Sequence, residues 1–114
     1  HIGYPFSEYL FTMMVNDENL WTDLAMLYKR PLWMTWNMVL AKETGVLDRV
    51  MFATDFVAAN NDLFGPDPTK DILEWVDLVQ NGMNKICKQS GWPTFTEKEI
   101  MGILHDNAAR LYNL

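Results

Sequence analysis

The sequence predicts an α/β fold, because two strand-like segments alternate with segments of helical periodicity. Residues 50–53 form a continuous apolar run that follows the charged pair Asp48 and Arg49 and ends close to Asp55. Short apolar runs of this kind are typical of strands buried in parallel sheets. Residues 20–24 form a second candidate strand, and helix-like patterns lie on both sides of each strand. This order favours parallel βα units joined by right-handed crossovers.

The expected elements follow one another without an internal repeat. In order they are a strand end and turn at residues 1–5, a helix at 6–14, a strand at 20–24, a helix at 31–44, a strand at 50–54, a loop at 56–66, and helices at 67–89 and 96–112. Pro31 can begin its helix, and Gly45 can end it in a left-handed conformation. Thr96 and Glu99 have the spacing of a capping box. A break is expected at residues 81–82, where Asn is followed by Gly.

Two full strands and the end of a third cannot close a sheet, and they leave the helix faces with too little to cover. The chain also opens at His1, with no methionine and no preceding element. We therefore expect residues 1–114 to be a piece of one domain, the C-terminal part of a (β/α)₈ barrel. Barrel strands are paired on both edges, so the piece alone should be inactive and should associate through its open edges.

Composition excludes several classes of partner. The net charge is −6, and the nine basic residues are scattered, which disfavours a nucleic-acid surface. No apolar run approaches the roughly 20 residues that span a bilayer. The single cysteine, Cys87, excludes an internal disulfide, has the spacing of a buried thiol and suits a reducing compartment. We expect a cytoplasmic protein, and a homo-oligomer because residues 31–40 are apolar on more than one side.

Five ordered segments carry a resemblance to a known family. They are HIGYP at residues 1–5, NLWTDLA at 19–25, DRVMFATDF at 48–56, a long loop, and TEKEIMGILHDNAARLYNL at 96–114. Together they resemble the C-terminal third of the amidohydrolase-related barrel enzymes, in particular those similar to aminocarboxymuconate semialdehyde decarboxylase. The resemblance implies that the chain runs from the end of strand six through strand eight to the closing helices.

The resemblance also implies the site residues. His1 matches a catalytic histidine at the end of strand six, and Asp55 matches a catalytic carboxylate at the end of strand eight that binds the metal. It implies one divalent ion, Zn²⁺ or alternatively Mn²⁺, and a small carboxylic acid as substrate, which is decarboxylated or hydrolysed. Phe56, Asn60 and Asn61 follow the carboxylate and can wall the substrate. The histidine ligands of strands one and five would precede His1.

One departure from the family pattern lies beside the carboxylate. The family often has a proline two residues after the aspartate, and this chain has Val57 there.

The residues themselves leave simpler interpretations open. Asp55 can serve as a loop cap or an ion-pair partner, and His1 can be solvated. Asp23 can be a second carboxylate at the rim of the site, or can bond to backbone or to an arginine. Lys29 and Arg30 can bind a substrate carboxylate or remain solvated charges.

A second hypothesis assigns the chain to a different class of protein. It is a non-catalytic α/β interaction or assembly module derived from a barrel, because a partial barrel would expose an acidic, aromatic-rich surface. Two other polar residues fit either hypothesis. His105 is expected to face solvent, and Asn107 to cap a final helix.

Overall fold

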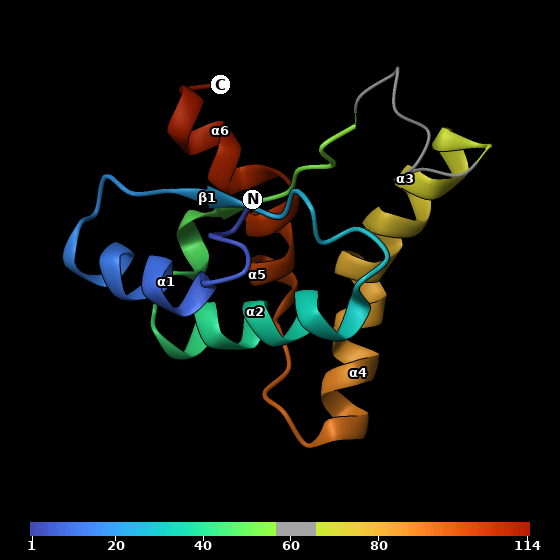
Figure 1. Cartoon of the computed structure of the whole chain (residues 1–114), viewed down its shortest axis with the longest axis horizontal. Helices are drawn as coiled ribbons and strands as arrows, with labels where there is room; N and C mark the ends of the chain where they lie inside the picture. The colour runs from blue at the N-terminus through green and yellow to red at the C-terminus, as the bar shows by residue number, and fades with distance from the viewer. Residues whose placement is uncertain (57–65) are drawn as a thin grey trace.

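The computed structural model describes residues 1–56 and 66–114 (Figure 1). Two helical segments have π-type hydrogen bonding and join the α-helices on either side of them. The elements are α1 (Ser7–Asn16), β1 (Thr22–Asp23), α2 (Pro31–Glu43), the 3-10 turn η1 (Leu47–Arg49), β2 (Val50–Met51), α3 (Pro68–Asp77), the π-helical η2 (Leu78–Gly82), α4 (Met83–Ser90), α5 (Glu97–Met101), the π-helical η3 (Gly102–Asp106) and α6 (Asn107–Tyr112).

The two strands form a parallel pair, as the sequence predicts, although each strand is shorter than expected. Thr22 lies opposite Val50, and Asp23 lies opposite Met51. The Leu24 amide donates to the Met51 carbonyl at 3.0 Å, which places that carbonyl on the β1 side. The α/β assignment is therefore confirmed for a mainly helical chain with a small parallel sheet.

The other edge of β2 is capped by the C-terminal helices. Residues alternate in the edge they face along a strand, so Val50 and Phe52 face away from β1. The Phe52 amide donates to the Ile103 carbonyl of η3 at 2.7 Å. The Asn107 side-chain amide donates to the carbonyls of Val50 at 2.8 Å and Leu47 at 3.1 Å. Asn107 therefore caps a strand edge, and its expected role as a helix cap is wrong. The outer edge of β2 is therefore hydrogen-bonded to the C-terminal helices, in contrast to the expectation of open strand edges.

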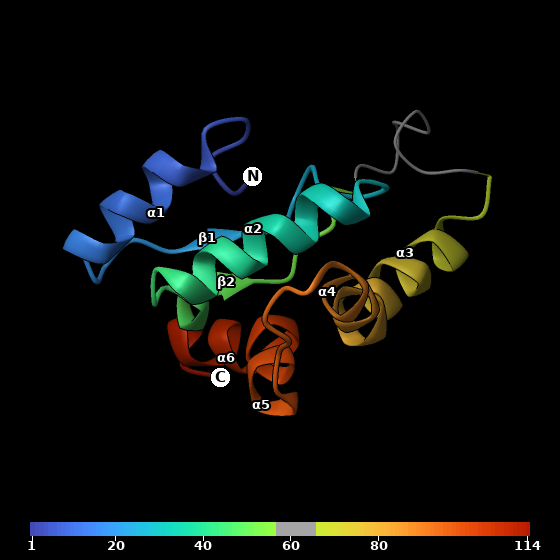
Figure 2. The same cartoon turned by 90° about the horizontal axis from the view of Figure 1, so that it is seen from below.

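Helices cover the strand pair on two sides. Figure 2 shows β1 and β2 between α1 and α2 on one side and α5 and α6 on the other. The core consists of apolar side chains from α1–α5, from η2, η3 and β2 and from the connecting segments, and it includes Phe11, Met14, Leu24, Met34, Met38, Val50, Trp75, Met83 and Ile103. Cys87 is buried and unpaired among them, and its burial raises the pKa of the thiol, which agrees with the expected inert cysteine. Among the described residues, no helix is long and apolar enough to cross a bilayer.

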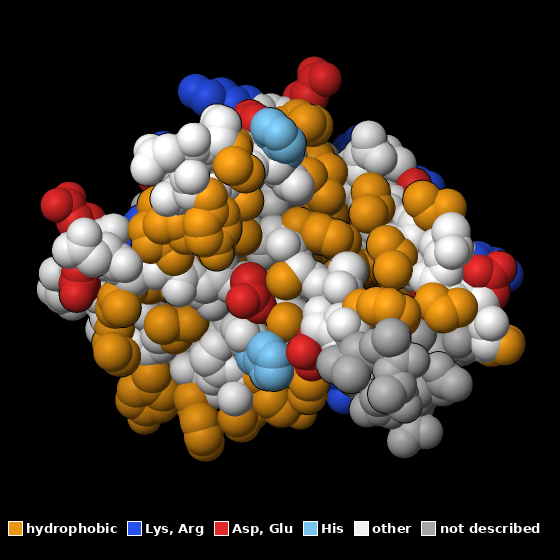
Figure 3. All heavy atoms as spheres, turned by 90° about the horizontal axis from the view of Figure 1, so that it is seen from above, with side chains coloured by type: hydrophobic (Ala, Val, Ile, Leu, Met, Phe, Trp, Pro, Cys, Tyr) orange, Lys and Arg blue, Asp and Glu red, His pale blue; other side chains and the backbone are white. Residues whose placement is uncertain are grey.

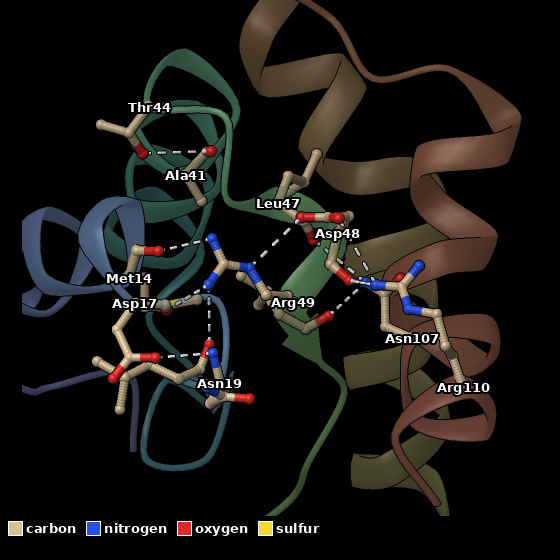
Figure 4. A network of polar contacts seen from close by, with 12 residues as sticks. Met14, Asp17, Asn19, Ala41, Thr44, Leu47, Asp48, Arg49, Asn107 and Arg110 are labelled. Carbon is tan, nitrogen blue, oxygen red and sulfur yellow. Dashed lines mark hydrogen bonds and ion pairs between the residues drawn. The ribbon is translucent and has the colours of Figure 1, made fainter. Parts of the chain in front are cut away.

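Arg49 joins the end of α1 to the beginning of β2 (Figure 4). Its guanidinium donates to the carbonyls of Met14 at 2.7 Å, Asp17 at 2.8 Å and Leu20 at 3.3 Å. The side chain is only 13% exposed. A planar fork of donors can reach several carbonyls at once, so Arg49 satisfies backbone groups that a helix end leaves without partners.

The helix ends agree with the sequence prediction at most positions. Pro31 is the first residue of α2, and Gly45 follows the end of that helix with φ of +76°. The Asp67 carboxylate caps α3 by accepting from the Lys70 amide at 3.1 Å. The expected break at residues 81–82 is replaced by η2, which carries α3 into α4 without an interruption.

The first five residues form a turn and not the expected strand end. The Tyr4 amide donates to the His1 carbonyl at 2.9 Å, and the Phe6 amide donates to the Gly3 carbonyl at 2.7 Å. Ile2 and Gly3 have left-handed backbone conformations, with φ of +52° and +69°. Two consecutive left-handed residues reverse the chain direction, so no extended strand forms there.

The capping box at the start of α5 is present and is joined to α2. Glu99 accepts from the Thr96 amide at 2.8 Å, and the Thr96 hydroxyl accepts from the Glu99 amide at 3.2 Å. Lys42 of α2 donates to the Glu99 carboxylate at 2.9 Å. Burial alone would raise the pKa of Glu99, but the hydrogen bonds from Thr96 and Lys42 outweigh it, and the net pKa lies below the ordinary value of 4.5.

Replacing Glu99 with glutamine is expected to lower the free energy of unfolding by about 1 kcal/mol near neutral pH. Because the folded-state pKa is depressed, this contribution is present above the ordinary pKa and is lost as the pH falls through the folded-state value. Urea unfolding at about pH 7 and about pH 3 would measure it. Glu97→Gln, an exposed position in the same helix, is the matched control. An equal loss at both pH values would contradict the assignment.

Candidate active site at the carboxyl ends of the strands

His1, Asp23 and Asp55 come together where the two strands end. The His1 Nε2 atom lies 3.4 Å from the Asp55 carboxylate. The amino group of His1 lies 3.2 Å from Asp23, whose same oxygen accepts from the Ala25 amide at 2.9 Å. In the view from above, a histidine side chain lies between acidic side chains (Figure 3). In parallel α/β folds this edge of the sheet is where ligands bind.

The segment that carries Asp55 is held in place by α3. The buried indole of Trp75 donates to the Ala53 carbonyl at 3.0 Å, two residues before Asp55. The Phe56 amide donates to the Thr54 hydroxyl at 3.1 Å, one residue on either side of Asp55. The Asp55 side chain is 27% exposed, so it is accessible while its backbone is fixed.

Left-handed backbone conformations gather at this end of the molecule. Among the described non-glycine residues, Ile2, Met26, Lys29 and Asp55 have positive φ, and a fifth, Asn113, lies near the C-terminus. Met26 and Lys29 lie in the connection that leaves β1, and Asp55 lies in the one that leaves β2. Such conformations cost on the order of 1 kcal/mol each and cluster at functional sites. They favour this edge of the sheet as the site.

A second polar group, which the sequence does not predict, lies beside the same connections. Burial, followed by the hydrogen bond that the Tyr28 hydroxyl donates to Asp71 and by the charges of Asp71 and Glu74, raises the pKa of Tyr28 above its ordinary value. The Tyr28 ring packs edge-on against Trp75, with ring centroids 6.0 Å apart. A cavity of about 230 Å³ opens here, and Lys29 lies 4.0 Å from Asp71 at its margin. In the sequence, Asp71 is distinguished only by its position in the first turn of a helix, which does not predict its contact with Tyr28.

The two basic residues of this connection have partners within the chain. Lys29 lies near Asp71, and the Arg30 guanidinium donates to the Met26 carbonyl at 2.6 Å. Both contacts favour the structural interpretation of these charges over substrate binding. Asp23 likewise bonds to backbone, which was the simpler expectation for that residue.

The other candidate residues are only partly described. Phe56 follows Asp55 and is 43% exposed, so its ring lies at the surface of the candidate site. Asn60 and Asn61 lie outside the described residues. His105 is exposed, as expected, and contacts the neighbouring Asp106 at 2.8 Å.

The donor atoms at this edge fit part of a metal site. A carboxylate and an imidazole are ligands that divalent ions such as Zn²⁺ accept, but a protein site usually supplies about three ligands. In residues 1–56 and 66–114 there is no group of three or more histidine, cysteine or acidic side chains arranged to hold an ion. The described residues can therefore supply a ligand and a proton-transfer group, and not a complete set.

The carboxyl end of this parallel pair therefore carries a histidine and a carboxylate in contact with each other. A family model described as amidohydrolase matches residues 1–114, and the chain belongs to this family. The comparisons with curated proteins and with solved structures gave no match. Members of the family typically bind metal ions, which agrees with the donor atoms at this edge.

Proposed function

We propose that the chain is the C-terminal part of a (β/α)₈ enzyme similar to aminocarboxymuconate semialdehyde decarboxylase. The complete enzyme decarboxylates or hydrolyses a small carboxylated cyclic or unsaturated acid. The family match over residues 1–114 supports the class of enzyme. The observation that carries the reaction is the 3.4 Å approach of His1 to Asp55 at the carboxyl end of the parallel strands.

Asp55 supplies one ligand to a single divalent ion, Zn²⁺ or alternatively Mn²⁺. When bound, such an ion polarises an oxygen of the substrate and can lower the pKa of a water ligand to about 7. The carboxylate of Asp55 also accepts or returns a proton at this edge. His1 lies within reach of the same carboxylate, and imidazole is the side chain best suited to move a proton near neutral pH.

The substrate side of the site is formed by the segment after Asp55. The exposed ring of Phe56 offers an apolar surface for a planar or unsaturated acid. Asn60 and Asn61, which lie outside the described residues, complete the wall of the substrate site in this proposal. The remaining metal ligands are histidines of the family's first and fifth strands.

A non-catalytic assembly module is the second candidate. It is favoured by the incomplete ligand set of the described residues and by the exposed aromatic side chains on α1 and α2. A pair of histidines separated by one residue, together with a further histidine in the preceding sequence, would favour the enzyme. We also propose a cytoplasmic location and assembly as a homo-oligomer.

The test uses the intact protein purified in the presence of Zn²⁺ or Mn²⁺. Metal analysis is expected to give about one divalent ion per chain. Incubation with a panel of small aromatic and unsaturated carboxylic acids is expected to release either carbon dioxide or a ring-opened acid, which separates decarboxylation from hydrolysis. A metal-free protein that converts no acid in the panel would support the module instead.

A further inference from the structure

The segment that leads from β2 to Asp55 is anchored by a tryptophan of α3. β1 pairs with β2 as far as Met51, whose carbonyl accepts from the Leu24 amide at 3.0 Å. In an extended chain, carbonyls two residues apart point to the same side, and the next one after Met51 is that of Ala53. The Trp75 indole donates to that carbonyl at 3.0 Å. α3 therefore continues the support that β1 gives to β2, two residues before Asp55.

The indole of Trp75 is fixed by rings from both connections that leave the strands. The residue is only 1% exposed. The Phe52 ring, at the end of β2, has its centroid 6.1 Å from that of Trp75. The Tyr28 ring, in the connection from β1 to α2, packs edge-on at 6.0 Å. Trp75 is therefore a side chain at which the two connections meet.

Tyr28 is in turn held by α3. Its ring is buried, and its hydroxyl donates to Asp71. Asp71 and Trp75 are four residues apart, so they lie on the same face of the helix. The Asp71 carboxylate is also buried and lies 4.0 Å from Lys29 Nζ. Two successive side chains of one helix face therefore hold the β1–α2 connection, and one of them also holds the segment before Asp55.

Asp55 needs such an anchor because of its backbone conformation. Its φ of +54° is left-handed, which a residue with a side chain disfavours. Such a conformation persists where the surrounding structure fixes it. The Phe56 amide donates to the Thr54 hydroxyl within the segment, whereas the bond from Trp75 to Ala53 comes from another element. The second bond therefore fixes the carboxylate relative to the rest of the molecule.

We propose that Trp75 is a positioning residue for Asp55, and that Tyr28 and Asp71 hold its indole in place. Trp75 acts through the backbone two residues before the carboxylate, and not by contact with a metal or a substrate. It sets where the carboxylate lies relative to His1 and to a bound ion. Its effect on metal binding rests on the proposed function, whereas the coupling of α3 to the Asp55 segment can be measured without it.

Replacing Trp75 with phenylalanine in the intact protein tests this role. The substitution keeps a ring against Tyr28 and Phe52 and removes the N–H donor. Hydrogen exchange, followed by mass spectrometry, is expected to be about fivefold faster for the amides of residues 54–56, because the segment loses a hydrogen bond. The dissociation constant for Zn²⁺, measured by competition with a chelator, should rise by about tenfold.

Two control variants separate positioning from a general loss of stability. Trp92→Phe makes the same substitution at a partly buried position in the loop between α4 and α5. Val79→Ala removes buried atoms four residues after Trp75 and is expected to lower the urea midpoint. Neither variant removes a donor to the Asp55 segment. Both should leave the exchange of residues 54–56 and the Zn²⁺ dissociation constant within about twofold of wild type.

A further set of variants tests how the indole is held. Tyr28→Phe and Asp71→Ala each remove one partner of the hydrogen bond between these side chains. Each is expected to raise the exchange rate of residues 54–56 and the Zn²⁺ dissociation constant by about threefold. Asp71→Asn keeps an acceptor for the Tyr28 hydroxyl and should stay closer to wild type.

Unchanged exchange of residues 54–56 in Trp75→Phe would overturn the positioning role, and so would an equal change in Val79→Ala. If Trp75→Phe does not fold, Tyr28→Phe decides: faster exchange of these amides supports the role, and wild-type exchange overturns it. A wild-type protein that binds no Zn²⁺ would count against the proposed function instead. The exchange comparison would then still decide whether α3 holds the segment.

Discussion

Replacing Asp55 with alanine in the intact protein is expected to remove most of the bound metal and to lower kcat/KM by about a thousandfold or more. Among the residues that the structure describes at this edge, Asp55 is the acidic side chain that contacts a histidine side chain, at 3.4 Å from His1 Nε2. Its loss takes away both a metal ligand and a group that holds a proton. Metal analysis and initial rates on the same preparation would measure the two effects together.

The chain contains its own control for this substitution. His105 and Asp106 form a second histidine–aspartate contact, at 2.8 Å, on an exposed part of the C-terminal helices. Asp106→Ala and His105→Ala should leave metal content and kcat/KM close to wild type. His1→Gln should lower kcat more than it changes metal content, because His1 is assigned proton transfer and not ligation. Full activity of Asp55→Ala would contradict the proposed site.

Replacing Arg49 with alanine is expected to lower the free energy of unfolding by about 3 kcal/mol, because three backbone carbonyls lose a charged donor. At roughly 2–4 °C per kcal/mol, as for a chain of more than about 150 residues, the melting temperature of the intact protein should fall by several degrees. Urea unfolding and thermal melting of the intact protein would measure the loss. Arg49→Lys should recover only part of it, since a lysine cannot reach several carbonyls with a planar fork.

Arg110→Ala is the matched control for Arg49. Its guanidinium lies 3.6 Å from the Asp48 carboxylate and is 54% exposed, so its loss should cost less than about 1 kcal/mol. Equal losses for the two arginines would show that the contacts of Arg49 to the end of α1 carry no special weight. If Arg49→Ala does not fold, the comparison of Arg49→Lys with Arg110→Lys serves the same purpose.

Local features of the fold could be predicted from the sequence, because they depend on residues close together in the chain. The capping box of Thr96 and Glu99 spans three residues, and the start of α2 at Pro31 depends on that residue alone. The two strands could be located by their apolar runs. Their ends could not, because the left-handed conformations of Met26 and Asp55 have no marker such as glycine.

Contacts between distant residues account for what the sequence did not predict. Asn107 bonds to Val50, 57 residues away, and its position at the start of a helical segment suggested a local cap instead. Arg49 bonds to Met14 across 35 residues, and nothing near Arg49 in sequence marks those carbonyls. Helical periodicity also does not distinguish an α-helix from the π-helical turns of η2 and η3.

The candidate site likewise combines positions that could be predicted from the sequence with contacts that could not. The position of Asp55 beyond a buried strand followed from the apolar run before it. The approach of His1 to Asp55 followed only from the resemblance to a family, because the two residues are far apart in sequence. The contact of Tyr28 with Asp71 has no pattern in the sequence, since it depends on how the β1–α2 connection packs against α3.

The capped edge of β2 has a consequence for any strand that joins the sheet there. An incoming strand would offer an acceptor to the Phe52 amide and a donor to the Val50 carbonyl, and Ile103 and Asn107 already supply both. Such a strand has to displace the helices from these two groups before it can pair. Closing a ring of strands at this edge would therefore replace existing hydrogen bonds with new ones and add few in total. The net contribution of hydrogen bonding to the free energy of closure would be close to zero. The driving force for closure would have to come from apolar side chains that the arriving strand buries.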